Sequence, residues 1–378
     1  MPSPPAPAAL DVCLPSGTLH LTLDQASAPL DDLLTYAVRR NPRRGFLFVS
    51  RVLGKHIPVS PDVAARSYHD LAAALPTLHA PHFIGLAETA TALGEGVFRA
   101  WQAQQRTERG TFQHTTRYAV TGRSVLLRFD EPHSHAPAHL LYDPGETARR
   151  AEELVLIDDE LSTGTTLEHL TRAWTDLHPH VRRVVLVSLT DWCGRRQELA
   201  AALGLPLDFV SLSRGTYTFT PDPGWTPAAL PSVVGNGANK AALLPALSPR
   251  YGQPSEVPTP GELGLDLTPE DRVLVLGSGE FQYPAFLLAQ SLAPLAAACH
   301  FSATTRSPVL PGLGIAQHLS FTDSVGDGIP NYLYNVDPAR YTRILVTFEG
   351  NCTPDPVLMA ALGPHAQAIR LSPPLDPR

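Results

Sequence analysis

The sequence predicts an α/β fold, in which a mainly parallel sheet with helices on both faces is followed by a second, smaller α/β domain. Three observations predict it. The chain has 378 residues, which is longer than a domain built on a single hydrophobic core usually is. Short apolar strands alternate with helical stretches, as is typical of parallel sheets. Many of the 38 prolines fall in 221–260, where they would break long helices and inner strands.

Composition divides the chain into four parts. We expect a disordered tail at 1–16, because the first ten residues are rich in Pro and Ala. We expect the first domain at 17–221, a Pro- and Gly-rich linker at 222–264, and the second domain at 265–378.

The individual elements follow from hydrophobic spacing. Leu33, Leu34, Ala37 and Val38 would share one helix face, so a helix is expected at Leu30–Arg40. Apolar runs separated by polar or small-residue turns predict the remaining elements. The expected helices are 62–75, 93–105, 165–177 and 281–292, with one more at the start of 195–210. The expected strands are 46–53, 83–86, 111–120, 125–129, 154–157, 184–189, 273–276 and 344–346, with one more at the end of 195–210.

Charge and composition exclude several classes of protein. The net charge is -7 with no block of like charge, which argues against wide nucleic-acid or membrane binding. No apolar run is long enough for a bilayer and no basic segment precedes an apolar N-terminal stretch, so a cytoplasmic protein is expected. The four cysteines lie far apart without metal spacing. Lys55 and Lys240 are the only lysines among 29 basic residues, either by accident of composition or because they have a role.

The most informative segment is Val155–Thr166, in which an apolar strand ends in Asp158 and Asp159 and is followed by a hydroxyl-rich turn. Main-chain N–H groups of residues 162–166 and the positive end of the next helix would bind a phosphate monoester. The turn consists of Ser162, Thr163, Gly164, Thr165 and Thr166, in which the glycine lets the backbone curl round the anion. The carboxylates suit sugar hydroxyls or a hydrated Mg²⁺ ion. The alternative is that the acids end a strand and Ser162 or Thr163 caps a helix.

This segment resembles the 5-phosphoribosyl 1-diphosphate (PRPP) motif of type I phosphoribosyltransferases, and it departs from the motif at Glu160, where an apolar residue is usual. The resemblance assigns Asp158 and Asp159 to the ribose hydroxyls and residues 162–166 to the 5-phosphate. The chain is still more similar to the orotate phosphoribosyltransferase-like family of tellurium-resistance and stress gene clusters. That family carries a C-terminal TRSP domain, whose motif is 305–308 in this chain. The resemblance implies a stress-related pathway that makes a nucleoside-like metabolite.

Other candidates surround this motif. Ala87, Glu88 and Thr89 lie where the family holds pyrophosphate with main-chain amides, although a helix N-terminus would have a similar sequence. Lys55 follows an apolar strand and is expected to contact phosphate. His133 and His135 lie where the family has a mobile lid, and they could meet diphosphate charge there or belong to an ordinary loop.

The two halves also resemble each other. Residues 114–117 parallel 303–306, so TRSP is interpreted as a degenerate duplicate, with chance similarity as the alternative. Arg117 and Arg306, each preceded by two threonines, are candidate grips for an anion or a base. Asn331 and Tyr332 are candidates for acceptor recognition, or for packing alone.

The sequence therefore predicts a pentosyltransferase that transfers ribose 5-phosphate from PRPP to a base-like nitrogen nucleophile, releasing pyrophosphate and a nucleoside 5-monophosphate. Mg²⁺ is the expected cofactor, held by Asp158 and Asp159 directly or through water. A homodimer is a candidate assembly. The alternative function is an inactive protein that senses PRPP or a nucleotide.

Overall fold

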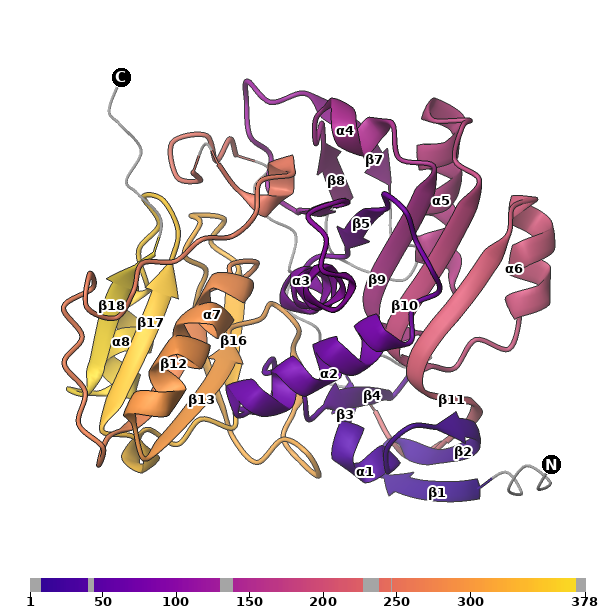
Figure 1. The fold of residues 1–378 in the computed structure, drawn as a ribbon. Coiled ribbons are helices and arrows are strands. Elements are labelled where there is room, and N and C mark those ends of the chain that lie inside the picture. Colours follow the sequence, from indigo (N-terminus) through magenta and orange to yellow (C-terminus); the bar gives the residue numbers. More distant parts are fainter. Residues whose placement is uncertain (1–7, 40–43, 130–138, 227–237, 246, 372–378) are drawn as a thin grey trace.

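The structure is a computed structural model that describes residues 8–39, 44–129, 139–226, 238–245 and 247–371. Its two main sheets lie side by side with helices between and outside them (Figure 1). In the described part of the chain, no helix combines the length and the apolar character needed to cross a bilayer.

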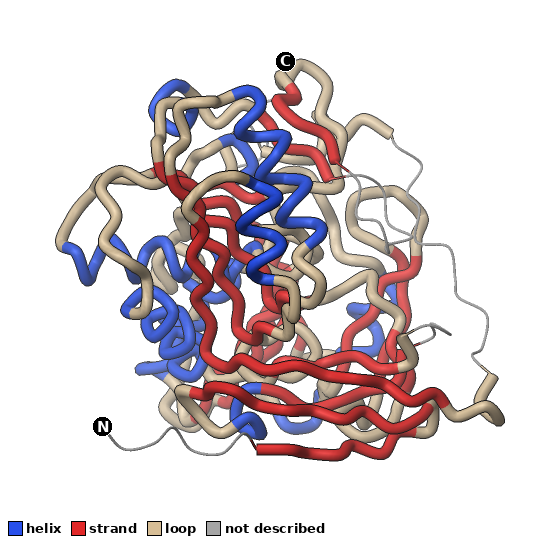
Figure 2. Tube along the Cα trace, turned by 90° about the vertical axis from the view of Figure 1, so that its right-hand side faces the viewer, coloured by secondary structure: helices blue, strands red, loops and turns tan. Residues whose placement is uncertain are grey.

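The larger sheet has seven strands in the order β1-β2-β11-β10-β9-β5-β6. The five strands from β11 to β6 run parallel, whereas β1 and β2 extend the sheet antiparallel at one edge. The strands are β1 (Ala8–Leu14), β2 (Gly17–Ala26), β5 (His82–Gly85), β6 (Thr111–His114), β9 (Glu153–Leu161), β10 (Arg183–Asp191) and β11 (Leu207–Pro221). The N-terminal strands lie at the bottom in Figure 1, and the side view shows strands running across that end (Figure 2).

Helices cover both faces of this sheet. They are α2 (Pro61–Ala73) and α3 (Thr91–Gln105) on the inner face, and α5 (Thr165–Leu177) and α6 (Arg196–Leu203) on the outer face (Figure 1). Successive residues of β9 explain this arrangement, because side chains alternate across a strand. Val155 and Ile157 pack in the core with α2 and α3, whereas Leu154 and Leu156 pack with α5 and α6. A strand buried on both faces has to be apolar throughout.

The second sheet has four parallel strands in the order β13-β12-β17-β18. They are β12 (Arg272–Gly277), β13 (Ala298–Ala303), β17 (Arg343–Phe348) and β18 (Ala366–Arg370), and the helices of this half are α7 (Tyr283–Leu292) and α8 (Pro356–Leu362). The hairpins are β7 (Val125–Phe129) with β8 (His139–Tyr142), and β15 (His318–Thr322) with β16 (Pro330–Tyr334). The short helical elements are α1 (Leu30–Leu33), α4 (Glu146–Arg149), η1 (Pro249–Tyr251), η2 (Ala293–Leu295) and η3 (Pro338–Arg340).

The two halves share one core. Helix α7 packs against α2 and α3, and the rings of Tyr68 and Phe286 meet at 5.1 Å. Strand β14 (Val309–Leu310) of the second half pairs with β3 (Leu34–Arg39), which in turn pairs with β4 (Phe46–Ser50). The second domain is therefore packed tightly against the first.

Three expectations about local structure are wrong. Residues 8–14, expected in a disordered tail, form β1, because they pair with β2 along their whole length; residues 1–7 lie outside the described part. The helix expected at Leu30–Arg40 ends at Leu33, because the β-branched and aromatic residues that follow pair with β4 instead. The strand expected at 111–120 ends at His114, and only Thr116 beyond it forms a bridge, to Leu140.

The second half repeats the hydrogen bonds of the first. The order β6-β5-β9-β10 matches β13-β12-β17-β18. The matched bonds are Thr115 N to Gly85 O and Thr304 N to Gly277 O (both 2.9 Å), Ala87 N to Thr115 Oγ1 (2.8 Å) and Gly279 N to Thr304 Oγ1 (2.9 Å), and Val120 N to Tyr142 Oη (2.7 Å) and Val309 N to Tyr334 Oη (2.8 Å). Such a run of equivalent bonds supports duplication over chance similarity.

Candidate active site

The acidic end of β9 lies at the carboxyl edge of the large sheet. Asp158 and Asp159 are half-buried, and a carboxylate oxygen of Asp158 accepts a hydrogen bond from the Asp159 N–H at 2.9 Å. Burial raises the pKa of Asp159, while the Lys55 ammonium opposes that shift. Ligands of parallel sheets bind at this edge, between the strand ends.

The turn after β9 has the conformation that the motif requires. Gly164 has φ of +74° and precedes α5 directly. A Cβ at this position would lie 2.6 Å from Cδ1 of Leu199, so the site demands glycine on two grounds. The Thr163 and Thr165 hydroxyls lie 3.0 Å apart on its exposed side. The first N–H groups of α5 have no partner within the helix, and together with the hydroxyls they form a cradle for an anion.

Glu160, the departure from the motif, has a structural partner. Its carboxylate accepts a hydrogen bond from Arg44 at 2.6 Å, and Arg44 also lies over the Phe46 ring. Burial raises the pKa of Glu160, and Arg44 opposes that shift. An ion pair thus takes the place of apolar packing here.

Lys55 joins this cluster from a different segment. It is 4% exposed, and its ammonium donates to the Thr89 hydroxyl at 3.1 Å. The main chain of the Thr89 loop is fixed by the bond from Ala87 N to Thr115 Oγ1, and the peptide between Ala87 and Glu88 is cis. Lys240, by contrast, pairs with Asp327 at 2.6 Å in the second half. Of the two lysines, only Lys55 lies among the candidate site residues.

Glu88 and Arg117 meet the second domain. The Arg306 guanidinium approaches the Glu88 carboxylate at 4.0 Å, and the Gln282 amide donates to the Glu88 carbonyl at 3.0 Å. The main-chain N–H of Arg117 donates to the Glu280 carboxylate at 2.7 Å. Arg306 therefore lies beside the first domain's loop.

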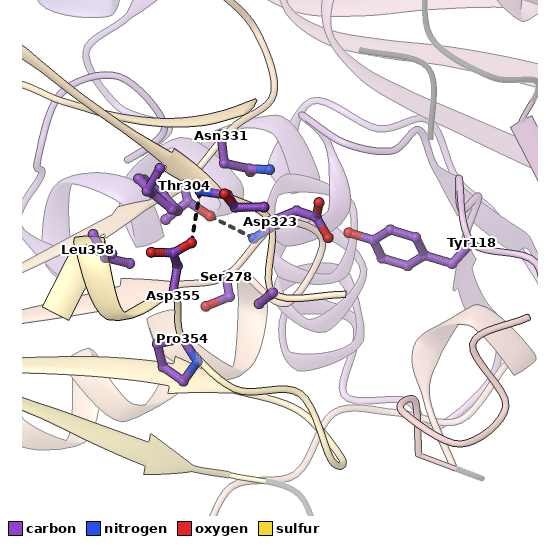
Figure 3. Close-up of a pocket in the computed structure, with 12 residues that line it drawn as sticks. Tyr118, Ser278, Thr304, Asp323, Asn331, Pro354, Asp355 and Leu358 are labelled. Atoms are coloured by element: carbon purple, nitrogen blue, oxygen red, sulfur yellow. Dashed lines mark hydrogen bonds between the residues drawn. The ribbon is translucent and has the colours of Figure 1, made fainter. Parts of the chain in front are cut away.

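Asn331 and Tyr332 lie deeper in the second domain. Tyr332 is buried, stacks on Tyr334 with centroids 5.9 Å apart, and pairs through its main chain with Thr305. Asn331 lines a small pocket beside Asp323 and Asp355 (Figure 3). Both residues thus have second-domain neighbours, Asn331 at the small pocket and Tyr332 against Tyr334 and Thr305.

The remaining candidates are the histidines. His133 and His135 lie outside the described residues. Nearby, His139 stacks on Phe129 at 4.9 Å, and its Nδ1 lies 2.9 Å from the Thr115 hydroxyl. The described part of the chain holds no group of three or more His, Cys, Asp or Glu residues arranged to bind a metal ion.

Sequence reasoning missed the ionic network between the two domains. Arg250, inside the expected linker, is 1% exposed and binds Glu280 at 2.9 Å and Glu349 at 2.7 Å. In the duplicate, these acids hold the positions of Glu88 and Asp159, so an arginine fills the second half's counterpart of the site. Asp355 caps α8 with its own carboxylate, where the first half has its anion cradle. The repeat could have indicated the two glutamates, because they follow strands equivalent to β5 and β9, whereas no signal in the sequence pointed to Arg250.

Comparisons with known proteins agree with this architecture. A family model described as phosphoribosyl transferase matches residues 33–216, and a model described as the TRSP domain C-terminal to that transferase matches residues 256–362. No curated protein is similar enough to count as a match.

Several solved structures are similar to part of the chain. An APRTase from Giardia lamblia is 15% identical, covers 50% of this chain and 98% of its own, and has a TM-score of 0.33. An adenine phosphoribosyl transferase from Trypanosoma brucei is 12% identical, with coverages of 55% and 86% and a TM-score of 0.33. A hypoxanthine phosphoribosyltransferase from Trypanosoma cruzi is 14% identical, with coverages of 43% and 81% and a TM-score of 0.25.

The two family models cover most of the chain in consecutive segments, and the first contains the acidic strand end, the glycine turn and the Lys55 loop. The chain therefore belongs to the phosphoribosyl transferase family and carries a TRSP domain C-terminal to its transferase domain.

Proposed function

We propose that this pentosyltransferase uses PRPP and Mg²⁺ to ribosylate a nitrogen of a base-like acceptor. The bond between C1 and the diphosphate oxygen breaks, a bond from C1 to nitrogen forms, and the products are a nucleoside 5-monophosphate and pyrophosphate. The observation that carries the proposal is the meeting of two separate segments at one sheet edge. One is 158–164, which holds the Asp158–Asp159 pair and the Gly164 turn, and the other is the segment of buried Lys55, whose charge acts on Asp159.

The proposed roles follow from the chemistry of each group. The hydroxyls and N–H groups of residues 162–166 hold the 5-phosphate, while Asp158 and Asp159 accept from the ribose hydroxyls. Lys55 and Thr89 face the diphosphate, whose negative charge grows as it leaves. Catalysis then comes from positioning and from stabilising that charge, so no covalent nucleophile is needed.

The donor set fits Mg²⁺ of the kind that stays partly hydrated. Mg²⁺ commonly uses one or two carboxylates together with substrate oxygens, and Asp158 and Asp159 supply adjacent carboxylates at the edge of the site. These two residues would hold the ion, which would neutralise diphosphate charge when bound. The protein groups would orient the sugar between the phosphate cradle and Lys55.

Different residues serve the reacting end of the donor and the acceptor. We assign Arg117, His133 and His135 to the reacting end of the donor, and Asn331 and Tyr332 to acceptor recognition. The family resemblance supports a role in stress metabolism that includes tellurium resistance. We also propose a cytoplasmic location and a homodimer as a candidate assembly.

The test replaces both acids, as Asp158→Asn with Asp159→Asn, in the full chain. An amide oxygen accepts hydrogen bonds from sugar hydroxyls less well than a carboxylate does. Pyrophosphate release from PRPP should therefore fall to background, while the unfolding temperature stays unchanged. The matched control is Asp31→Asn with Asp32→Asn, an adjacent and exposed pair in α1. Wild-type kinetics in the site variant would refute the assignment. PRPP binding by the wild type without pyrophosphate release would instead indicate a sensing protein.

A further inference from the structure

Glu88 is held by the second domain through both its main chain and its side chain. Gln282 donates to its carbonyl at 3.0 Å, and the Arg306 Nε lies 4.0 Å from one carboxylate oxygen. The Arg306 guanidinium is itself held by Tyr118, whose ring centroid lies 5.0 Å away and whose hydroxyl accepts from it. The loop that follows β5 is thus fixed from outside its own domain.

This pairing is incomplete. The Glu88 side chain is 11% exposed and the Arg306 side chain 8% exposed. The other carboxylate oxygen of Glu88 and the Nη1 of Arg306 are buried without a hydrogen-bond partner in the described structure. Buried polar atoms without partners are costly, so they point to a ligand that completes them.

The duplicate provides an internal comparison. Glu280 follows Gly277 at the same spacing at which Glu88 follows Gly85. It accepts from the Thr116 hydroxyl at 2.6 Å, from the Arg117 N–H at 2.7 Å and from Arg250 at 2.9 Å. The glutamate at this position can therefore be fully satisfied within the fold, and in the first half it is not.

We propose that Arg306 of the second domain binds the diphosphate of PRPP, holding Glu88 with one edge of its guanidinium and donating its free Nη1 to a diphosphate oxygen. This proposal rests on the proposed function. A bare Glu88 carboxylate would repel the diphosphate from the adjacent amides, and a neighbouring guanidinium removes that repulsion. The second domain thus completes the diphosphate end of the first domain's site.

The test measures binding of inorganic pyrophosphate and of ribose 5-phosphate separately, by calorimetry in the presence of Mg²⁺. Arg306→Gln should weaken pyrophosphate binding by about tenfold or more and leave ribose 5-phosphate affinity within about twofold. Adding Glu88→Gln to that variant should restore part of the loss, because the repelling charge is gone. Arg340→Gln, an exposed arginine of the same domain, is the matched control. If Arg306→Gln fails to fold, Arg306→Lys takes its place. That variant keeps the charge, so its loss of pyrophosphate affinity should be smaller than the loss of about tenfold expected for Arg306→Gln.

Two results would overturn the proposal. One is unchanged pyrophosphate affinity in Arg306→Gln. The other is an equal loss of both ligands with no recovery on adding Glu88→Gln, which would indicate a purely structural role. Failure of the wild type to bind ribose 5-phosphate would instead refute the proposed function, so the two failures are distinguishable.

Discussion

Gly164→Ala tests the phosphate cradle through a change of a single methyl group. The residue has φ of +74°, and its new Cβ would lie 2.6 Å from Cδ1 of Leu199 and 3.7 Å from Cδ1 of Leu161. Leu199 is fully buried in the core beneath α5, so its side chain has little room to withdraw.

The expected cost has two parts. Left-handed backbone costs a non-glycine residue about 1 kcal/mol or slightly more. Crowding a packed core costs about 1–3 kcal/mol. Gly164→Ala should therefore lower the free energy of unfolding by about 2–4 kcal/mol in total. The distortion falls on the N–H groups that would hold the 5-phosphate, so ribose 5-phosphate affinity should fall about tenfold or more.

Gly204→Ala is the matched control. Gly204 also has positive φ (+64°), but its added Cβ would meet nothing within 4 Å. Urea unfolding should therefore show a loss of about 1 kcal/mol for this variant, with calorimetry showing unchanged ribose 5-phosphate binding. In a Leu199→Ala background, Gly164→Ala should cost only the backbone strain. Equal stability losses in Gly164→Ala and Gly204→Ala, or unchanged phosphate affinity in the former, would refute this account of the turn.

Three further predictions concern charge. Arg250→Met leaves two buried glutamates unpaired and should cost about 3–5 kcal/mol in urea unfolding; a loss below about 1 kcal/mol would contradict the role given to this network. Burial lowers the pKa of His82 to about 3, so its contribution to stability is full above pH 6.5 and is lost as the pH falls toward 3. His82→Asn should therefore shrink the stability difference between about pH 7.5 and pH 5 by about 2 kcal/mol, and an unchanged difference would exclude a neutral buried imidazole. Lys55→Met should raise the pKa of Asp159 further, because Lys55 opposes the upward shift caused by burial. The acid limb of the pH–rate profile should therefore move to higher pH. An acid limb at the wild-type pH would show that Lys55 does not act on the Asp159 carboxylate.

The parts of the fold that the sequence could predict are those with strong local signals. The apolar strand, paired acids and glycine turn of 155–166 carry their structure within a dozen residues, and α5 occupies the expected 165–177. The helix predicted at Leu30–Arg40 was wrong, because the same spacing of apolar residues also fits a short helix followed by a buried strand. Only its pairing with β4 decides between the two.

The contacts between the domains were beyond local reasoning. Arg250 lies in a proline-rich stretch that has the composition of a linker, yet its partners are 30 and 99 residues away in the chain. Glu88 likewise gains Gln282 and Arg306 from the other half. The internal repeat predicted that the two halves are related, but a repeat does not specify how its two copies pack against each other.

The central claim is that residues 155–166 bind PRPP for transfer to a nitrogen nucleophile. The most direct test incubates the full chain with PRPP, Mg²⁺ and a panel of nitrogen bases, and then searches by mass spectrometry for a nucleoside 5-monophosphate. We expect one product whose mass equals that of a base plus ribose 5-phosphate minus one water, formed together with pyrophosphate and absent from the variant that combines Asp158→Asn with Asp159→Asn. Formation of the same product by that variant at the wild-type rate would contradict the account.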